Sequence, residues 1–139
     1  MPAKDSKPRW DSNNMIISEI ANYLATQGLG TVGTDIYYAY LPGGVYDGLV
    51  VLDTGGMLPD ADLPTKEPTF QIFIRSTSYS AGKAKMDLVR AALHQKTNTV
   101  LGSGTTYFYF ILAMAEGGHI GRTENGLDEF SINFRSRTR

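Results

Sequence analysis

The segment TFQIFIRS, from Thr69 to Ser76, constrains the fold most because its side chains alternate strictly between two classes. One face of this segment carries Phe70, Ile72 and Ile74, and the other carries Gln71, Phe73 and Arg75. Such alternation predicts a strand that buries one face against a core. Ser78 or Ser80 follows directly as a possible helix N-cap, so the chain is expected to pass from this strand into a helix.

Two amphipathic helices are predicted. The first begins at Asp11, Ser12 or Asn13 and ends at Gly28, and its apolar stripe consists of Ile17, Ile20, Ala21 and Leu24. In the second helix, the residues expected to face a sheet are Ala81, Ala84, Leu88, Ala91 and Ala92. The small alanine side chains favour close packing of this helix on the sheet.

Four further strands are expected around these elements. Ile36–Tyr40 and Leu49–Leu52 flank the turn sequence Pro-Gly-Gly and are predicted to form a hairpin. The apolar segment YFYFILAMA predicts a central strand covered on two sides. A last strand with Phe130, Ile132 and Phe134 facing inward is expected to pair with it, through a turn that contains Glu124, Asn125 and Gly126.

The order of elements predicts an α+β fold, with one mostly antiparallel (mixed) sheet and two helices packed on one face. A chain of 139 residues fits one domain. We expect this domain to span residues 11–135, between a loose arm at residues 1–10 and a basic tail at residues 136–139.

Composition excludes several classes of function. The formal net charge of -1 gives no overall field that would attract nucleic acid or an anionic membrane, and sequence-specific nucleic-acid binding is not expected. The absence of cysteine excludes disulfides and thiol catalysis. The first ten residues lack an apolar core, so no signal peptide or membrane partner is expected. His94 and His119 have no partner at metal-ligand spacing, and neither a metal nor a cofactor is predicted.

Asp53 is the one residue for which a catalytic role is weighed against a structural one. It belongs to the sequence VVLDTGG, and Asp-Thr-Gly is the motif in which retroviral-type aspartic proteases carry their catalytic carboxylate. A homodimer would supply the two aspartates that such chemistry needs. Against this hypothesis, the later HIGRTEN is followed by a polar turn and a strand instead of a bracing helix. The other interpretation is that Asp53 ends a strand and that the glycines after it form a turn.

A long irregular stretch follows, from Asp53 to Pro68. It contains two glycines, three prolines and four acidic residues, and an excursion of this length in a small domain is usually functional or mobile. Asp60, Asp62 and Glu67 lack the regular spacing of a calcium-binding loop, so a solvated loop is favoured over a calcium site. An acidic, proline-rich segment buries too little surface to fold alone, so we expect residues 57–66, with Asp60 and Asp62, to become ordered on a partner protein.

The ordered set of segments resembles a known family. TQGLGTVGTDIYYAYLP, VVLDTGG, TFQIFIRSTSYSAGKAKMDLVRAALH and GHIGRTENGLDEFSINF occur in the order and spacing of the minor capsid or tail terminator proteins of long-tailed bacteriophages. The resemblance covers residues 12–135. It matches DTGG to a strand-ending turn and Gly121–Arg122 to the start of a closing hairpin, although Thr123 stands where an acidic residue is usual.

The resemblance implies a structural, non-enzymatic protein of the virion, made in the host cytoplasm and located at the head–tail junction. Its implied partners are further copies of itself, the major tail tube protein and the head connector protein. The resemblance implies that the copies form a ring, which is six-fold in well-known members of the family. The residue types point to the contacts, because arginine and aromatic side chains are enriched in interface cores. The candidate contact residues are Phe73, Arg75, Arg122, Asp60 and Asp62.

Overall fold

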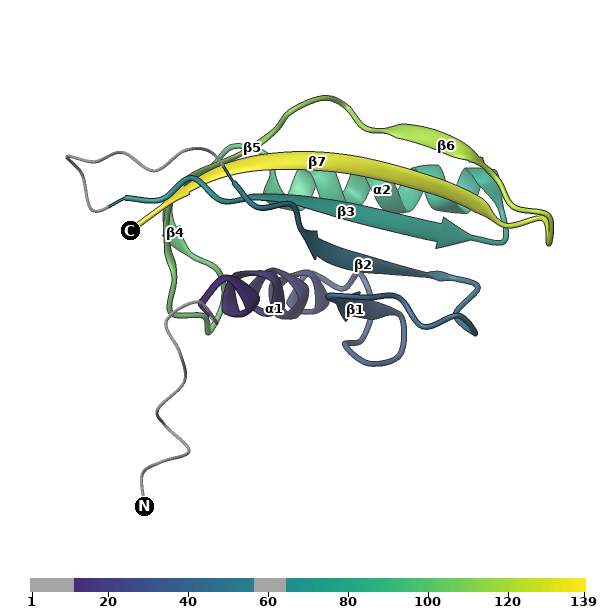
Figure 1. Cartoon of the computed structure of the whole chain (residues 1–139), viewed down its shortest axis with the longest axis horizontal. Coiled ribbons are helices and arrows are strands. Elements are labelled where there is room, and N and C mark those ends of the chain that lie inside the picture. The colour runs from purple at the N-terminus through teal and green to yellow at the C-terminus, as the bar shows by residue number, and fades with distance from the viewer. Residues whose placement is uncertain (1–11, 57–64) are drawn as a thin grey trace, which may run out of the picture.

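The computed structural model describes residues 12–56 and 65–139, and it is an α+β fold as predicted (Figure 1). Its two helices are α1 (Ser12–Thr26) and α2 (Tyr79–Leu93). Its strands are β1 (Ile36–Tyr38), β2 (Gly48–Asp53), β3 (Thr69–Ser76), β4 (Lys96–Val100), β5 (Tyr107–Ala113), β6 (Gly118–Arg122) and β7 (Asp128–Thr138). The predicted arm at residues 1–10 and the candidates Asp60 and Asp62 lie outside the described residues.

All of these strands belong to one curled sheet. Their order is β1-β2-β3-β7-β5-β4, and β6 also pairs with β7. Strand β7 is the longest of them, and it pairs with β3 along one side and with β6 and β5 in succession along the other. Every pairing is antiparallel except that of β1 with β2, so the sheet is mixed but mostly antiparallel.

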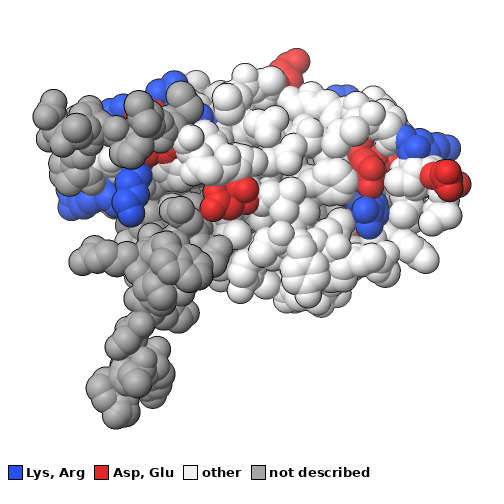
Figure 2. Space-filling model, in the orientation of Figure 1, with Lys and Arg blue, Asp and Glu red and all other residues white. Residues whose placement is uncertain are grey.

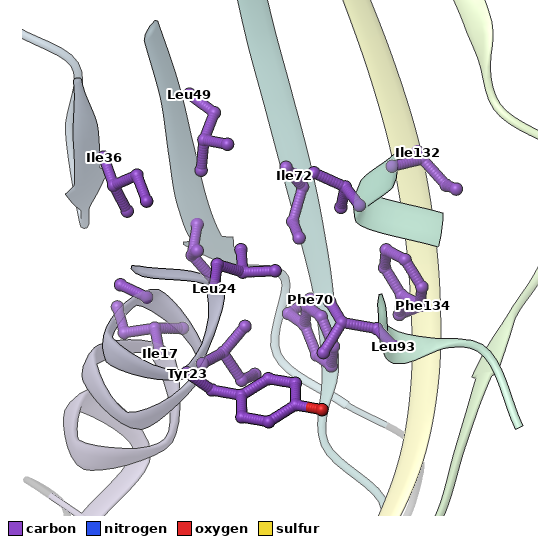
Figure 3. Close-up of a cluster of buried hydrophobic side chains, with 14 of the residues drawn as sticks. Ile17, Tyr23, Leu24, Ile36, Leu49, Phe70, Ile72, Leu93, Ile132 and Phe134 are labelled. Carbon is purple, nitrogen blue, oxygen red and sulfur yellow. The ribbon is translucent and has the colours of Figure 1, made fainter. Parts of the chain in front are cut away.

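Both helices pack on the same face of this sheet, as the sequence predicts. Helix α1 contacts β1 and β2, whereas α2 contacts β3, β7 and β5, and in Figure 1 α2 lies behind β3 and β7. Figure 3 shows a cluster of buried hydrophobic side chains that come from α1, β1, β2, β3 and β7 and from Leu93 at the end of α2. The rings of Phe70 and Phe134 stack there with their centroids 5.0 Å apart. The opposite face of the sheet carries no helix among the described residues, and we call it the helix-free face.

The buried face of α2 differs from the prediction. Its buried residues are Gly82, Met86, Val89 and Leu93. Leu88, expected to face the sheet, is 54% exposed. The predicted alanines are exposed or half-buried. Alanine is tolerated on both the buried and the exposed side of a helix. The orientation of α2 is instead determined by its large apolar side chains, Met86, Val89 and Leu93, and by the close approach of the sheet at Gly82.

The predicted hairpin of β1 and β2 is wrong, because these strands pair in parallel, with Ile36 opposite Leu49 and Tyr38 opposite Val51. The Pro-Gly-Gly turn exists, since Val45 N–H donates to the Pro42 carbonyl at 3.2 Å. It lies within a longer connection that returns the chain to the beginning of β1. A local turn therefore does not determine the relative direction of the two strands.

The closing region also differs from the expectation. Strand β5 does pair with β7, but the turn at Thr123–Gly126 joins β7 to β6, a strand that the glycine-rich sequence concealed. Strand β4 was also missed, because its sequence KTNTV is polar and lies at the sheet edge. Residues 136–138, expected to form a basic tail, continue β7, and Thr138 is 1% exposed.

Candidate interaction surface

Phe73 and Arg75 lie on the helix-free face, as the alternation of β3 requires. Phe73 is half-buried, and the Arg75 guanidinium lies over its ring with Cζ 5.9 Å from the centroid. Arg75 also forms an ion pair with Glu129 of β7, with Nη2 3.1 Å from Oε2. Its Nη1 donates to the carbonyl of Val45 at 3.4 Å. These contacts hold a cation and an aromatic ring in fixed positions on the surface.

Arg122 lies on the other side of β7, at the end of β6. Its Nη2 is 3.0 Å from Oδ2 of Asp128, while His119 Nε2 is 3.0 Å from Oδ1 of the same carboxylate. The hydrogen bond from Arg122 lowers the pKa of Asp128, and the hydrogen bond with His119 acts in the same direction. Asp128 is 2% exposed, so it holds the β6–β7 hairpin from inside while Arg122 stays at the surface.

Three of the predicted contact residues are therefore brought to one end of the sheet. Arg75 is opposite Glu129 across the β3–β7 pairing, and Arg122 is opposite Asp128 across the β6–β7 pairing. The two arginines flank the beginning of β7 from its two sides. Phe73 lies two residues before Arg75 on the same strand face.

A second ionic cluster, at the other end of β7, was missed by the sequence reasoning. Glu67 accepts hydrogen bonds from Arg135 at 2.8 Å and from Arg137 at 2.6 Å. The bond from Arg137 and then that from Arg135 lower the pKa of Glu67. Both guanidinium groups also lie over the ring of Phe110, at 5.7 and 5.8 Å from its centroid. The alternation of arginines with buried residues in β7 was visible in the sequence, but their partner was not.

Figure 2 shows how the charges are distributed over the side seen in Figure 1. Lys and Arg residues gather at the end where the chain's C-terminus lies. Acidic and basic groups alternate at the other end, and the surface between the two ends is mostly uncharged. A sheet face of this kind is suited to apolar and hydrogen-bonded contacts, with charged groups at its margins.

The candidate catalytic residue Asp53 is the last residue of β2 and is exposed. Its Oδ1 accepts a hydrogen bond from the Gly55 N–H at 2.8 Å, which closes a turn through the side chain. Gly55 and Gly56 have φ values of 101° and 133°, which only glycine adopts readily. The carboxylate thus has a structural task at the end of the strand.

The described residues include no group of three or more histidine or acidic side chains arranged to hold a metal ion. Within the same part of the chain, no helix has the length and apolarity needed to cross a membrane. The features that distinguish this surface are the aromatic and charged side chains fixed by the contacts of Phe73, Arg75 and Arg122. Such an arrangement can bind another macromolecule.

Comparison with known proteins agrees with this description. A family model described as "Bacteriophage tail terminator protein" matches residues 23–138. Among solved structures, the fold is similar to a chain in the "Virion of native gene transfer agent (GTA) particle", with a TM-score of 0.55 and 19% sequence identity. That similarity covers 91% of this chain and 92% of the other. No curated protein matches the sequence.

Proposed function

This chain belongs to the bacteriophage tail terminator family, and from that premise we propose that it caps the growing tail tube as a ring. The ring stops elongation and offers its outer side to the head connector protein. Its partners are further copies of itself, six in the complete ring, the major tail tube protein and the connector. The protein is made in the host cytoplasm and is incorporated into the virion at the head–tail junction.

The observation that carries this proposal is the family match over residues 23–138, which includes every strand of the described sheet. The surface supports it. A ring on a tube needs at least two binding surfaces on each copy, one for its neighbours and one for the tube. The helix-free face and the two ends of the sheet provide distinct surfaces of this kind, with different charges.

The contacts proposed for this assembly are Phe73, Arg75 and Arg122. Phe73 and Arg75 are held together by the cation–π contact, so little side-chain entropy is lost when a partner covers them. Arg122 is 61% exposed although its guanidinium is paired with Asp128. Asp60 and Asp62 are proposed as further contacts on the strength of their sequence alone.

Deletion of the gene in a producing strain tests the function directly. We expect headless tails of uncontrolled length and heads that accumulate separately, both visible by electron microscopy. Expression of the intact gene from a plasmid restores normal particles. Tails of normal length in the deletion strain would refute the proposal.

Point variants in the complemented strain then test the surface. Phe73→Thr keeps a strand-forming residue but removes the ring, and we expect folded protein that terminates tails poorly. The double variant Asp60→Asn and Asp62→Asn tests the two acidic contacts in the same assay. Normal termination by either variant removes the corresponding residues from the interface.

Asp53→Asn is the matched control for the protease alternative. Asparagine can still accept the hydrogen bond from Gly55, but it cannot act as an acid or a base. We expect tails of normal length from this variant. Cleavage of a peptide library by the parent protein at acid pH, abolished in Asp53→Asn, would instead establish a protease.

A further inference from the structure

The chain carries an arginine at every second position along the end of β7. Arg135, Arg137 and Arg139 point to the helix-free face, because the side chains of a strand alternate between the two faces of a sheet. Arg139 follows the last residue of β7, and its N–H continues the pairing with β5 by donating to the Tyr107 carbonyl at 3.1 Å. We call these three residues the arginine row. Its successive members lie about 7 Å apart, since a strand advances ~3.4 Å per residue.

Aromatic rings of β5 hold the arginine row in place. Phe110 is directly opposite Arg137 in the β5–β7 pairing, and its ring contacts the guanidinium groups of both Arg135 and Arg137. Arg139 lies over the ring of Tyr107, with Cζ 5.5 Å from the centroid. Cation–π contacts of this kind restrain long side chains. A nucleotide base stacks on a bare aromatic ring, whereas these rings already carry guanidinium groups.

Glu67 neutralises only part of the positive charge of the arginine row. Its single carboxylate pairs with both Arg135 and Arg137, and Arg139 adds a third cation. The Glu67 side chain is 18% exposed, whereas those of Arg135 and Arg137 are 44% and 37% exposed, so the carboxylate lies deeper than the guanidinium groups. Each guanidinium has five N–H donors, and the bonds to Glu67 use only some of them. A ligand at this surface therefore meets cations with unused donors.

These features suit a phosphate polyanion. A guanidinium group binds two phosphate oxygens at once and keeps its charge at any physiological pH. Each strand of duplex DNA carries one phosphate per ~3.4 Å of helix axis, so a row of cations can follow its backbone. The carboxylates of an acidic protein have no such regular repeat, and Glu67 already occupies the place of a carboxylate in this cluster. Figure 2 shows that Lys and Arg gather at this end of the molecule.

We propose that the arginine row binds the phosphate backbone of duplex DNA without preference for base sequence. Contacts to phosphate oxygens position a protein on DNA but carry no sequence information. The site is local, because a chain with a formal net charge of -1 has no overall field that attracts DNA to its other surfaces. The inference goes beyond the proposed function, whose partners are all proteins.

The test measures the fluorescence anisotropy of a labelled duplex titrated with the purified protein. Three phosphate contacts predict that the association constant falls roughly 40-fold between about 50 and 200 mM salt. The double variant Arg137→Gln and Arg139→Gln removes two of these contacts. We expect it to bind at least about tenfold more weakly at the lower salt concentration, with a salt slope smaller by about 2.

Glu67→Gln changes the affinity in the opposite direction. The amide keeps an oxygen that accepts hydrogen bonds from the arginines, but it removes the negative charge that competes with phosphate. We expect this variant to bind the duplex several-fold more tightly than the parent protein. A loss of folding cannot produce such a gain, and weaker binding by folded Glu67→Gln contradicts the proposed site.

The matched control is the double variant Lys83→Gln and Arg90→Gln. It removes two positive charges from α2, which packs on the other face of the sheet, and we expect it to bind as the parent protein does. An equal loss of affinity in both double variants would overturn the site, because only net charge would then matter. Tighter binding of a single strand would indicate base stacking, and tighter binding of polyglutamate would indicate an acidic protein partner. Either result overturns the proposal.

The binding assay and the deletion experiment have separate outcomes. Duplex binding by the arginine row, together with normal tails in the deletion strain, keeps this site and refutes termination. Tails of uncontrolled length, together with a protein that does not bind the duplex at low salt, refute this site alone.

Discussion

Glu19 of α1 lies directly against Gly104 in the connection between β4 and β5, so closely that a Cβ at Gly104 would overlap the carboxylate. The same carboxylate accepts hydrogen bonds from the backbone N–H groups of Thr105 and Thr106 at 2.9 and 3.0 Å, and from the Thr106 hydroxyl at 2.7 Å. Glu19 is 8% exposed. One buried side chain thus attaches the connection to the first helix, and glycine at position 104 makes the approach possible.

Gly104→Ala is expected to lower the free energy of unfolding by about 1–3 kcal/mol, the usual cost of overpacking. Gly43→Ala is the matched control, because a Cβ at Gly43 meets no atom within 4 Å. Neither glycine has a positive φ, so the comparison isolates the steric effect. Urea denaturation measures both variants, and equal stabilities would show that the connection moves aside freely.

Glu19→Ala is expected to cost about 2–4 kcal/mol, because two backbone donors lose a charged acceptor and become unsatisfied. Amide exchange offers a local measurement. We expect the N–H protons of Thr105 and Thr106 to exchange much faster in this variant. Unchanged exchange at these two amides would contradict the assigned role of the carboxylate.

Gly82→Ala tests the packing of α2 against β7. Alanine favours a helix over glycine by about 1 kcal/mol, yet a Cβ at Gly82 would overlap the ring of Phe130. We therefore expect a net loss of stability of roughly 1–3 kcal/mol. Phe130→Leu in the same chain removes the overlap, so the double variant loses less than the sum of the two single variants. Additive losses would show that the two residues do not interact.

The contacts of Asp128 and Glu67 lead us to expect that the folded protein becomes less stable in acid. Their carboxyl pKa values lie below the ordinary 3.8 and 4.5, because Arg122 and Arg137 respectively donate hydrogen bonds to them. A lowered pKa in the folded state contributes stability above the unfolded pKa, and this stability is lost as pH falls toward the folded pKa. The free energy of unfolding is therefore expected to decrease as the pH falls below about 4–5.

Urea midpoints of the parent protein and of Asp128→Asn, measured from about pH 7 to about pH 3, check this expectation. The difference in urea midpoint between the parent protein and Asp128→Asn is expected to be largest near neutral pH and to become smaller in acid. Asp87→Asn serves as the control, since Asp87 is 45% exposed and forms only a 3.4 Å pair within its own helix. A constant difference across the range would mean that ionisation of Asp128 does not contribute.

Ala39, in the connection between β1 and β2, has a φ of 76°, a left-handed conformation that is uncommon for a residue other than glycine. Ala39→Gly tests the strain at this position. Relief of the left-handed conformation outweighs the greater chain entropy of unfolded glycine, and we expect a gain of about 0.5 kcal/mol. Ala84→Gly, at an exposed position in α2, is expected to lose about 1 kcal/mol in the same thermal or urea assay. Equal losses at both positions would show that the connection is not strained at Ala39.

The sequence predicted those parts of the fold that depend on local periodicity. The alternation of apolar side chains around Ile72 and Ile132 predicted the buried faces of β3 and β7 correctly. Side chains of a strand point alternately to the two faces of the sheet, so the pattern had to distinguish only between these two faces. The face of α2 was assigned wrongly because alanine has little preference for either side, and Gly82 carries no apolar side chain that would mark it. The parallel pairing of β1 was missed because strand direction depends on tertiary contacts.

The candidate surface was predictable to the same limited extent. The positions of Phe73 and Arg75 follow from the alternation of β3. The ionic cluster at Glu67 joins residues 68 and 70 positions apart, and no local pattern reports such a distance. A hollow whose lining includes Thr54, Thr69, Met114 and Phe134 is likewise assembled from four separate segments, so it exists only in the folded chain.

The place of β7 in the sheet has a consequence for how the protein is made. This strand is synthesised after every other described element, yet it supplies the hydrogen-bond partner on one side of β3, β5 and β6. Until β7 leaves the ribosome, these strands have unpaired edges, and the rings of Phe70 and Phe134 cannot stack. The sheet therefore closes only once translation of β7 is finished, so an interrupted translation product cannot assemble this sheet.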